Sequence, residues 1–389
     1  MPHLERLLSD FPSAEYERLV ATRRDLHRHP ELAFQERRTA AIVAGRLAEL
    51  GLAPRTGVAE TGVLADCGTD GTRLMLRADM DALPLEEETG APYASEEEGR
   101  MHACGHDGHV AIALAVAERL AADTPANAVR FLFQPAEEGR GGAQACADAG
   151  ALDGVGAALG LHLWSPLPVG TVGVNRGALM AAVDEFTIDI EGRGGHGASP
   201  HEAADPILAA ARVVDALQSV VSREISPLDS AVVTVASIHG GTAFNVIPST
   251  VRLTGTARSF TETTGRALPQ KIERIVQGTA AACGVTARLH YERINGATVN
   301  DAKMADLVID VASRMLGDAN VETDTRTLGG EDMSVYLGRV PGCFFFVGCA
   351  KEGPLRPHHS SAFDFDERAL AVGTAVMDAV LREAARRAS

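Results

Sequence analysis

Residues 109–139 read HVAIALAVAERLAADTPANAVRFLFQPAEEG, and this stretch decides the class of fold. Its first part, from His109 to Ala122, is rich in Ala, Leu and Val and is typical of a helix packed into a core. The short apolar run from Val129 to Phe133 predicts a buried strand, and a polar turn with two adjacent acids follows it. Helices that alternate with buried strands indicate an α/β sheet with helices on both faces.

Neighbouring segments extend this pattern in both directions. Further apolar runs predict strands at residues 62–65, 73–77 and 157–164. Helical periodicity appears over roughly residues 12–50, and Gly51 is a plausible cap at its end. The end of the chain predicts a helix, a strand and a last helix at residues 302–315, 344–348 and 367–387. We therefore expect one large α/β domain built from both ends of the chain.

The pattern changes near residue 182. Residues 185–191, EFTIDIE, alternate apolar and polar side chains, which is typical of a half-exposed antiparallel strand. A helix, two strands, a helix and a strand are then predicted near residues 206–221, 231–238, 249–259, 269–282 and 287–292. This β-α-β-β-α-β order is ferredoxin-like. We expect an inserted α+β domain at residues 184–293, between two parts of the first domain at 1–183 and 294–389.

The composition excludes several classes of partner. The chain has 389 residues, which is more than one core usually serves, and its 36 basic and 52 acidic residues give a net charge of -16. That charge disfavours nucleic acid and anionic membranes, because phosphates are neutralised by Lys and Arg. The first residues lack the apolar core of a secretory signal, and no long apolar run is present. We expect a cytoplasmic protein in which five of the six cysteines are structural thiols.

The densest group of reactive side chains is MHACGHDGH, at residues 101–109. Cys104 and His106 stand two apart on a glycine-flexed loop and can present a thiolate and an imidazole to one or two metal ions. Two other interpretations stay open at this point. In the first, the loop is exposed and is rich in His by chance. In the second, Cys104 is a nucleophile with His106 or His109 as its base.

Two adjacent acids, Glu137 and Glu138, follow the strand at residues 129–133. Neighbouring side chains of an extended segment point in opposite directions, so one acid can face a metal and the other a substrate. Adjacent glutamates are also common on solvated surfaces, but strand ends are where α/β sheets bind ligands. Further candidates are Asp79, Asp81, His162, Glu331, Asp332, His358 and His359. Such a set suits Zn, Mn, Co or Ni better than Mg or Ca, and its size suggests two ions with a bridging water.

Together these motifs resemble metallopeptidase family 20, subfamily D, which includes hippurate hydrolases, N-acyl-amino-acid amidohydrolases and auxin-conjugate hydrolases. The resemblance runs from DLHRHPEL at residues 25–32 to FDFDE at residues 363–367. Between them stand RADMDALP, MHACGHDGH, QPAEEG, GLHLW, GRGGHGASPH, FNVIP and GGED, in the expected order. It implies a phosphorylase/hydrolase-like catalytic domain with an inserted ferredoxin-like lid and dimerisation domain.

The resemblance also implies an activity, namely metal-dependent hydrolysis of the amide bond of N-acyl amino acids. Two divalent ions per subunit, Zn, Mn, Co or Ni, would serve it, in a homodimer or homotetramer formed through the inserted domain. An exopeptidase or an N-acetyl-diaminopimelate-type deacetylase would use the same metals. Other classes are a thiol hydrolase with Cys104 as nucleophile, which chelators would not inhibit, and a non-catalytic binding protein.

Carried over residue by residue, the resemblance implies five metal ligands: Cys104, His106, Glu138, His162 and His359. His359 is preferred to His358 because it stands four residues before Phe363, although the sequence HSSAF lacks the proline usual in this motif. Glu137 would be the general base, and Asp79 a carboxylate that orients a ligand.

The inserted domain would contribute three residues that contact the substrate, His196, Asn245 and Arg258. His196 would reach the active site of the partner subunit, and Asn245 and Arg258 would hold the α-carboxylate of the substrate. Without the resemblance, the simplest interpretation is structural: His196 and Asn245 lie in turns, and Arg258 lies on the solvated face of a strand.

Overall fold

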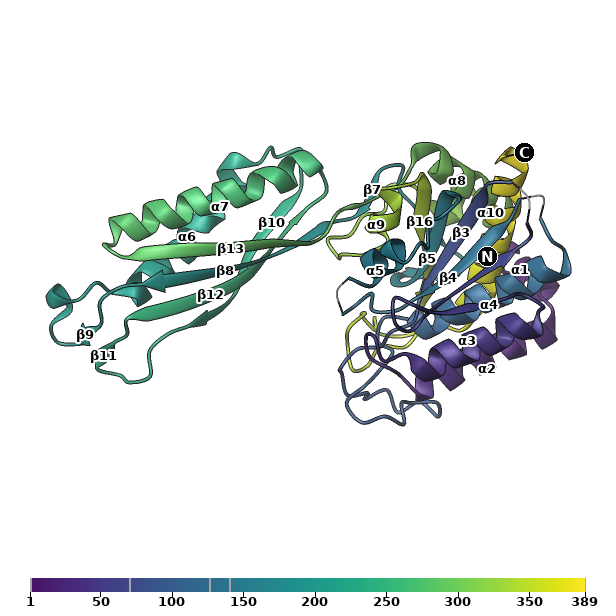
Figure 1. The fold of residues 1–389 in the computed structure, drawn as a ribbon, viewed down its shortest axis with the longest axis horizontal. Helices are drawn as coiled ribbons and strands as arrows, with labels where there is room; N and C mark the ends of the chain where they lie inside the picture. The colour runs from purple at the N-terminus through teal and green to yellow at the C-terminus, as the bar shows by residue number, and fades with distance from the viewer. Residues whose placement is uncertain (1, 70, 126, 140, 389) are drawn as a thin grey trace. The chain divides into compact units, whose positions relative to one another are not determined.

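The computed structural model describes residues 2–69, 71–125, 127–139 and 141–388. It consists of two compact units (Figure 1). Unit 1 comprises Met1–Leu179, Val299–Arg326 and Asp332–Ser389, and unit 2 comprises Met180–Thr298 and Thr327–Glu331. The segment expected as an insertion, 184–293, lies within unit 2. The chain crosses between the units within β7 (Ala178–Met180) and β14 (Thr298–Val299), and again on either side of the short segment Thr327–Glu331.

Unit 1 is built on an eight-stranded mixed sheet in the order β1-β2-β4-β3-β5-β16-β6-β15. Its centre consists of parallel strands, β4 (Val129–Gln134), β3 (Arg73–Asp79), β5 (Val155–Pro168) and β16 (Gly342–Ala350). Every residue of β4 is buried, as expected for a strand whose two faces are both covered. The outer strands are β1 (Arg55–Val58), β2 (Gly62–Cys67), β6 (Val172–Gly173) and β15 (Val321–Glu322). The expected α/β class with a large sheet is confirmed.

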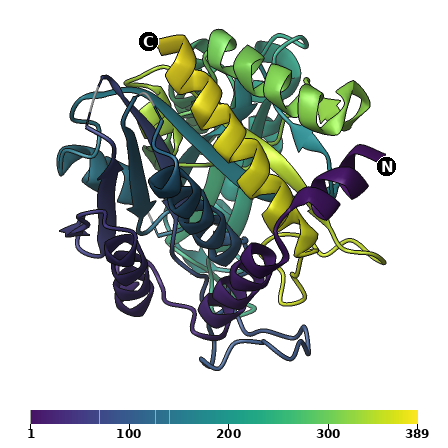
Figure 2. The ribbon, with the colours of Figure 1, turned by 90° about the vertical axis from the view of Figure 1, so that its right-hand side faces the viewer.

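Helices cover this sheet, and α10 (Arg368–Ala388), the yellow helix of Figure 2, packs between α4 (His106–Ala122) and α8 (Ala302–Leu316). The others in unit 1 are α1 (Pro2–Asp10), α2 (Ser13–Arg28), α3 (Arg37–Glu49), α5 (Gly142–Asp148) and α9 (Ser334–Leu337), with the 3₁₀ turn η2 (Asp318–Asn320). The helical segment expected over residues 12–50 is two helices, α2 and α3. The break follows from Pro30, because a residue that precedes proline disfavours helical geometry.

Unit 2 is a four-stranded antiparallel sheet in the order β10-β12-β8-β13. Its elements follow one another as β8 (Ala182–Glu191), α6 (Pro206–Glu224), β10 (Ala231–His239), β12 (Thr250–Ser259), α7 (Glu262–Ala282) and β13 (Thr286–Asn295). Residues of β8 are alternately buried and less buried, and Phe186, Ile188 and Ile190 form one core with both helices. A small ribbon of β9 (Gly195–His196) and β11 (Val246–Ile247), and the 3₁₀ turn η1 (Pro200–Glu202), complete the unit.

In the described part of the chain, no helix combines the length and the apolar character that crossing a bilayer requires. All six cysteines are free, and four of them, Cys67, Cys146, Cys343 and Cys349, are buried.

Candidate metal centre

Three parallel strands bring candidate residues to one level of the sheet of unit 1. Asp79, the last residue of β3, lies opposite Gln134, the last residue of β4. On the other side of β3, Arg77 lies opposite Gly160, so His162 of β5 follows at the level of Asp79. The chain beyond β4 then supplies Glu137 and Glu138. The carboxyl edge of these strands is the usual position of a ligand site in α/β sheets.

Cys104 and His106 come to the same edge at the start of α4. Gly105 between them has φ +94°, a left-handed conformation that glycine adopts without steric cost. The Nδ1–H of His106 donates to the carbonyl of Asp81 at 2.9 Å, which leaves Nε2 as the free ring nitrogen. That Nε2 atom is buried and has no hydrogen-bond partner. Because buried polar atoms are nearly always paired, an orphaned imidazole nitrogen beside a thiol fits a metal ligand.

His162 presents its ring in the same way. Its Nδ1–H donates to the carbonyl of Leu163 at 2.7 Å, and its Nε2 lies 3.4 Å from Sγ of Cys104. Donor atoms of Cys104, His106 and His162 therefore all lie within 4.8 Å of one another. A carbonyl that fixes the tautomer of a histidine is a common companion of metal ligation.

A second group of donors shares Cys104 with the first. The side-chain donors of Cys104, Glu138 and His359 lie within 4.8 Å of one another, and Nε2 of His359 is 2.9 Å from Oε1 of Glu138. The same limit holds for His106, Glu137 and Glu138. The five expected ligands are thus all members of two overlapping groups. Cys104 is the one residue common to both groups, and the five side chains together would suit one or two divalent ions.

The two C-terminal histidines face different surroundings. The ring of His358 stacks on Trp164 at 4.8 Å, and its Nε2 accepts the N–H of Ser165 at 3.1 Å. His359 has a left-handed backbone with φ +61°, and its N–H donates to the carbonyl of Ala103 at 2.9 Å. This turn brings His359, and not His358, to Glu138 and Cys104.

Asp79 contacts a histidine that was not expected as a ligand. Its Oδ1 accepts Nδ1–H of His109 at 2.6 Å, while Nε2 of His109 accepts the N–H of Leu163 at 2.9 Å. Both ring nitrogens of His109 are therefore used within the protein. Asp79 lies 3.7 Å from Nε2 of His106 and is paired with Arg77 at 2.6 Å. The sequence motifs predicted Asp79 as an orienting carboxylate, but the contacts of Asp81 and Leu163 with His106 and His109 are seen only in the hydrogen-bond pattern.

The donor cluster carries an excess of negative charge. Burial alone would lower the pKa of His106, but the carboxylates of Asp79 and Asp81 raise it to about 10. Desolvation and the carboxylates of Glu138 and Glu137 raise the pKa of the Cys104 thiol well above its ordinary value. A protonated thiol is a poor nucleophile, so these surroundings disfavour Cys104 as an independent nucleophile. A divalent cation satisfies the same carboxylates and would keep the sulfur as thiolate.

The three residues expected to contact substrate lie in unit 2. His196 and Asn245 are neighbours on the β9–β11 ribbon, where the carbonyl of Asn245 accepts the N–H of Gly197 at 2.8 Å. Arg258 lies near the other end of β12, roughly 26 Å along the strand from Thr250 at about 3.3 Å per residue. One copy of unit 2 therefore cannot bring both Asn245 and Arg258 to the carboxylate of one small substrate.

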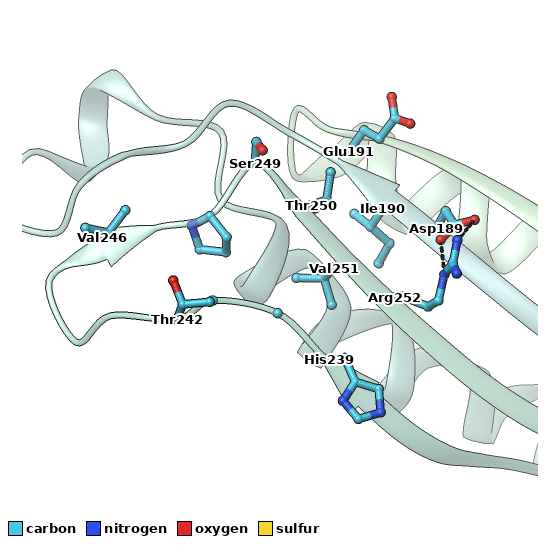
Figure 3. A pocket seen from close by; sticks show the side chains of 13 residues that line it. Asp189, Ile190, Glu191, His239, Thr242, Val246, Ser249, Thr250, Val251 and Arg252 are labelled. Carbon is cyan, nitrogen blue, oxygen red and sulfur yellow. Dashed lines mark hydrogen bonds and ion pairs between the residues drawn. The ribbon is translucent and has the colours of Figure 1, made fainter.

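Unit 2 also has an open pocket of about 750 Å³ beside the β9–β11 ribbon (Figure 3). It is lined by residues of β8, β10, β11 and β12, among them Val246, His239 and the ion pair of Asp189 with Arg252. None of the five expected metal ligands lines it.

A large α/β sheet whose strand ends gather Cys, His and Glu donors is the arrangement of a metal-binding hydrolase. The chain belongs to peptidase family M20/M25/M40, whose model matches residues 75–383.

Individual relatives agree with this membership. N-acetyl-L-cysteine deacetylase of Bacillus subtilis (strain 168) is 42% identical over 356 residues, which are 90% of this chain and 84% of that protein. IAA-amino acid hydrolase ILR1-like 4 of Arabidopsis thaliana is 39% identical over 367 residues, 92% of this chain and 83% of that one. The crystal structure of a Bacillus subtilis protein described as a dinuclear metal binding peptidase of the M20 family matches with a TM-score of 0.84 and 35% identity. That match covers 96% of this chain and 99% of the other.

Proposed function

We propose that this protein belongs to subfamily D of its family and hydrolyses the amide bond of N-acyl amino acids. The observation that carries the proposal is the buried, unpartnered Nε2 of His106, which lies among thiol, imidazole and carboxylate donors with Glu137 beside them. The names of the two relatives above describe the hydrolysis of modified amino acids, which supports this class of substrate.

Cys104, His106, Glu138, His162 and His359 would hold two divalent ions, Zn, Mn, Co or Ni. When bound, these ions would lower the pKa of a water molecule and polarise the acyl carbonyl. Glu137 would accept a proton from the attacking water and deliver it to the nitrogen of the leaving amine. The amide C–N bond breaks, and the products are a carboxylate and a free amino acid.

The proposed enzyme is a homodimer or homotetramer formed through unit 2. The separation of Asn245 from Arg258 supports this, because two copies are needed to bring both to one substrate. His196 of one copy would stabilise the oxyanion in the site of the other, and Asn245 of the same copy would help to hold the α-carboxylate of the substrate. Arg258 would pair with the α-carboxylate of the substrate through its planar guanidinium group.

Exposed apolar side chains and an open strand edge support assembly through unit 2. Ile238, Phe244 and Val246 are large apolar residues on its surface, and β10 is an edge strand of its sheet. Such surfaces are typical of interfaces, and an edge strand can pair with its copy across a two-fold axis.

The test is hydrolysis of N-acetyl, N-benzoyl and indole-acyl amino acids by one purified sample. The sample is assayed as purified, after chelation, and after addition of Zn, Mn, Co or Ni, with its metal content measured each time. Activity that is lost with the metal and restored by it supports the proposal. Activity in a verified metal-free sample refutes it and returns Cys104 to the role of nucleophile. Dipeptides and N-acetyl-diaminopimelate in the same panel test the exopeptidase and deacetylase alternatives.

A further inference from the structure

We propose that Asp81 is a positioning residue that sets the geometry of Glu137, Glu138 and His106 together. The inference rests on the proposed function, in which these three residues are the general base and two metal ligands. It assigns a role to a carboxylate that does not itself touch the substrate.

Asp81 contacts all three residues through different atoms. Its Oδ1 accepts the backbone N–H of Glu137 at 3.0 Å, and its Oδ2 accepts the backbone N–H of Glu138 at 2.9 Å. Its main-chain carbonyl accepts Nδ1–H of His106 at 2.9 Å. Asp81 is only 1% exposed and lies two residues beyond the end of β3, so the central sheet fixes its position. One residue thus connects the loop after β4 to the start of α4.

The residue before Glu137 is held in a similar way. The N–H of Ala136 donates to Oε1 of Glu36 at 2.9 Å, and Ala136 has a left-handed backbone with φ +55°. Three successive N–H groups, at residues 136–138, therefore donate to two carboxylates from other segments. Consecutive N–H groups of this kind form an anion-binding concavity, and here the anions are side chains of the protein itself. Because Glu36 and Asp81 bind the backbone N–H groups of this turn, the side chains of Glu137 and Glu138 remain available to the donor cluster.

Each carboxylate oxygen of Asp81 accepts one of the two N–H groups, so replacement of Asp81 with asparagine should disrupt one of these hydrogen bonds. An asparagine has a single acceptor oxygen, and its NH₂ group would confront the second backbone N–H, donor against donor. Asp301 provides a matched contrast in the same unit. A single oxygen of Asp301 accepts the N–H groups of both Lys303 and Met304 at 3.0 Å, at the start of α8. Asparagine can therefore replace Asp301, but not Asp81, without loss of a hydrogen bond.

The experiment compares Asp81→Asn with Asp301→Asn in the full chain. For Asp81→Asn we expect kcat to fall about 10–100-fold and the dissociation constant of Zn²⁺ or Mn²⁺ to rise by a similar factor, the usual range for residues that hold metal ligands. KM should change little, because Asp81 does not contact substrate. Asp301→Asn should match the wild type in all three quantities. Direct metal titration reports on Glu138 and His106 without catalysis, so the proposal stays testable even if no N-acyl amino acid is a substrate.

A second variant separates geometry from charge. Asp81→Glu keeps the charge but moves both oxygens by one methylene, so we expect it to remain impaired in metal affinity and in kcat. Wild-type metal affinity and kcat in Asp81→Asn would overturn the proposal, as would full function in Asp81→Glu. Failure of both variants to fold, seen by circular dichroism, would also overturn it, because Asp81 would then be a residue of general stability only.

Discussion

The two units of this molecule differ in the balance between buried charged side chains and exposed apolar ones. Unit 1 buries ions, and Arg23, Arg77, Asp79, Asp107, Asp332 and Asp364 are each at most 2% exposed. Unit 2 exposes large apolar side chains, namely Ile207, Leu208, Leu228, Ile238, Phe244, Val246 and Leu328. Within the part of the chain that the structure describes, unit 1 exposes only two such residues, Val299 and Leu355.

The buried ions of unit 1 hold the segments that carry the metal donors. Arg23 of α2 donates to Asp107 at 2.8 Å, next to His106, and to Asp364 at 3.2 Å, in the segment that follows His359. The same guanidinium group stacks on Phe365 at 4.3 Å. Burial of charge is costly unless every partner is in place, so such a network favours one geometry over its alternatives.

This contrast shows which unit is complete by itself. Unit 1 satisfies its own ions and gathers its own donor cluster. Unit 2 has its own apolar core but also exposes most of the large apolar side chains that lie on the described surface. We infer that unit 1 performs the chemistry and that unit 2 is completed by a second copy.

The largest effect is expected at the two adjacent acids of unit 1. Replacement of Glu137 with Ala removes the general base and should lower kcat by about 10²–10⁴-fold, while metal content stays at the wild-type level. Replacement of Glu138 with Ala should instead lower metal content, because it removes a ligand. Activity assays and metal analysis of the same preparations check both. Loss of metal from Glu137→Ala, with metal retained in Glu138→Ala, would show that the two roles are exchanged.

Much of unit 1 could be predicted from the sequence, because its signals are local. A buried strand, a following pair of acids and a His-rich start of a helix are each visible within a few residues. The sequence preferred His359 to His358 only through its spacing from Phe363. The structural reason is the left-handed backbone of His359 and the stack of His358 upon Trp164. The roles of Asp81 and His109 depend on strand register and on hydrogen bonds between distant segments, for which no motif exists.

Two further features of the fold follow from simple geometric rules applied to the sequence. Pro30 marks the break between α2 and α3, and its effect on the preceding residue is a local rule. The strand expected at residues 249–259 already implies a long separation between Asn245 and Arg258. A joint contact of these two residues with one carboxylate would therefore need one residue from each of two copies.

The next largest effect is expected at His196, in unit 2. His196→Ala should lower kcat by about 10²–10³-fold, the loss typical of one oxyanion donor, without loss of metal. If His196 serves the partner subunit, refolded mixtures of His196→Ala with Glu137→Ala should regain activity. Half of the dimers would be hybrids, each with one intact site, so about one quarter of wild-type activity is expected. A mixture as inactive as its parents would place His196 in the site of its own subunit, or outside any site.

A smaller effect is expected when the apolar surface of unit 2 is made polar. Phe244→Glu adds a charge to the surface that we expect to be buried between copies, so it should weaken assembly and lower activity about tenfold at dilute protein. Light scattering and activity are measured over a range of protein concentrations. Leu355→Glu, an exposed apolar residue of unit 1, is the matched control and should leave both unchanged. A Phe244→Glu variant that assembles like the wild type would contradict assembly through this surface.

The smallest effect is expected at a buried charge of unit 1, His27. Burial and Arg23 lower the pKa of His27, but hydrogen bonds to Asp107 at 2.8 Å and to Glu87 at 3.4 Å raise it above its usual value overall. The folded state thus favours the protonated ring. The stability this gives is fully present below about pH 6.5, the pKa of an unfolded histidine, and is lost as the pH rises through the folded pKa.

The melting temperature of His27→Gln should therefore be a few degrees below that of the wild type at pH 5.5, and this difference should shrink above neutral pH. Chelator-treated protein is used, so that release of metal at low pH does not contribute. His239→Gln, which changes an exposed histidine of unit 2, should melt like the wild type throughout this range. A His27→Gln deficit that is constant or grows with pH would mean that this ring is held neutral. A protonated histidine would then contribute no stability to the buried ion network of unit 1, and arginines would be the only cations in that network.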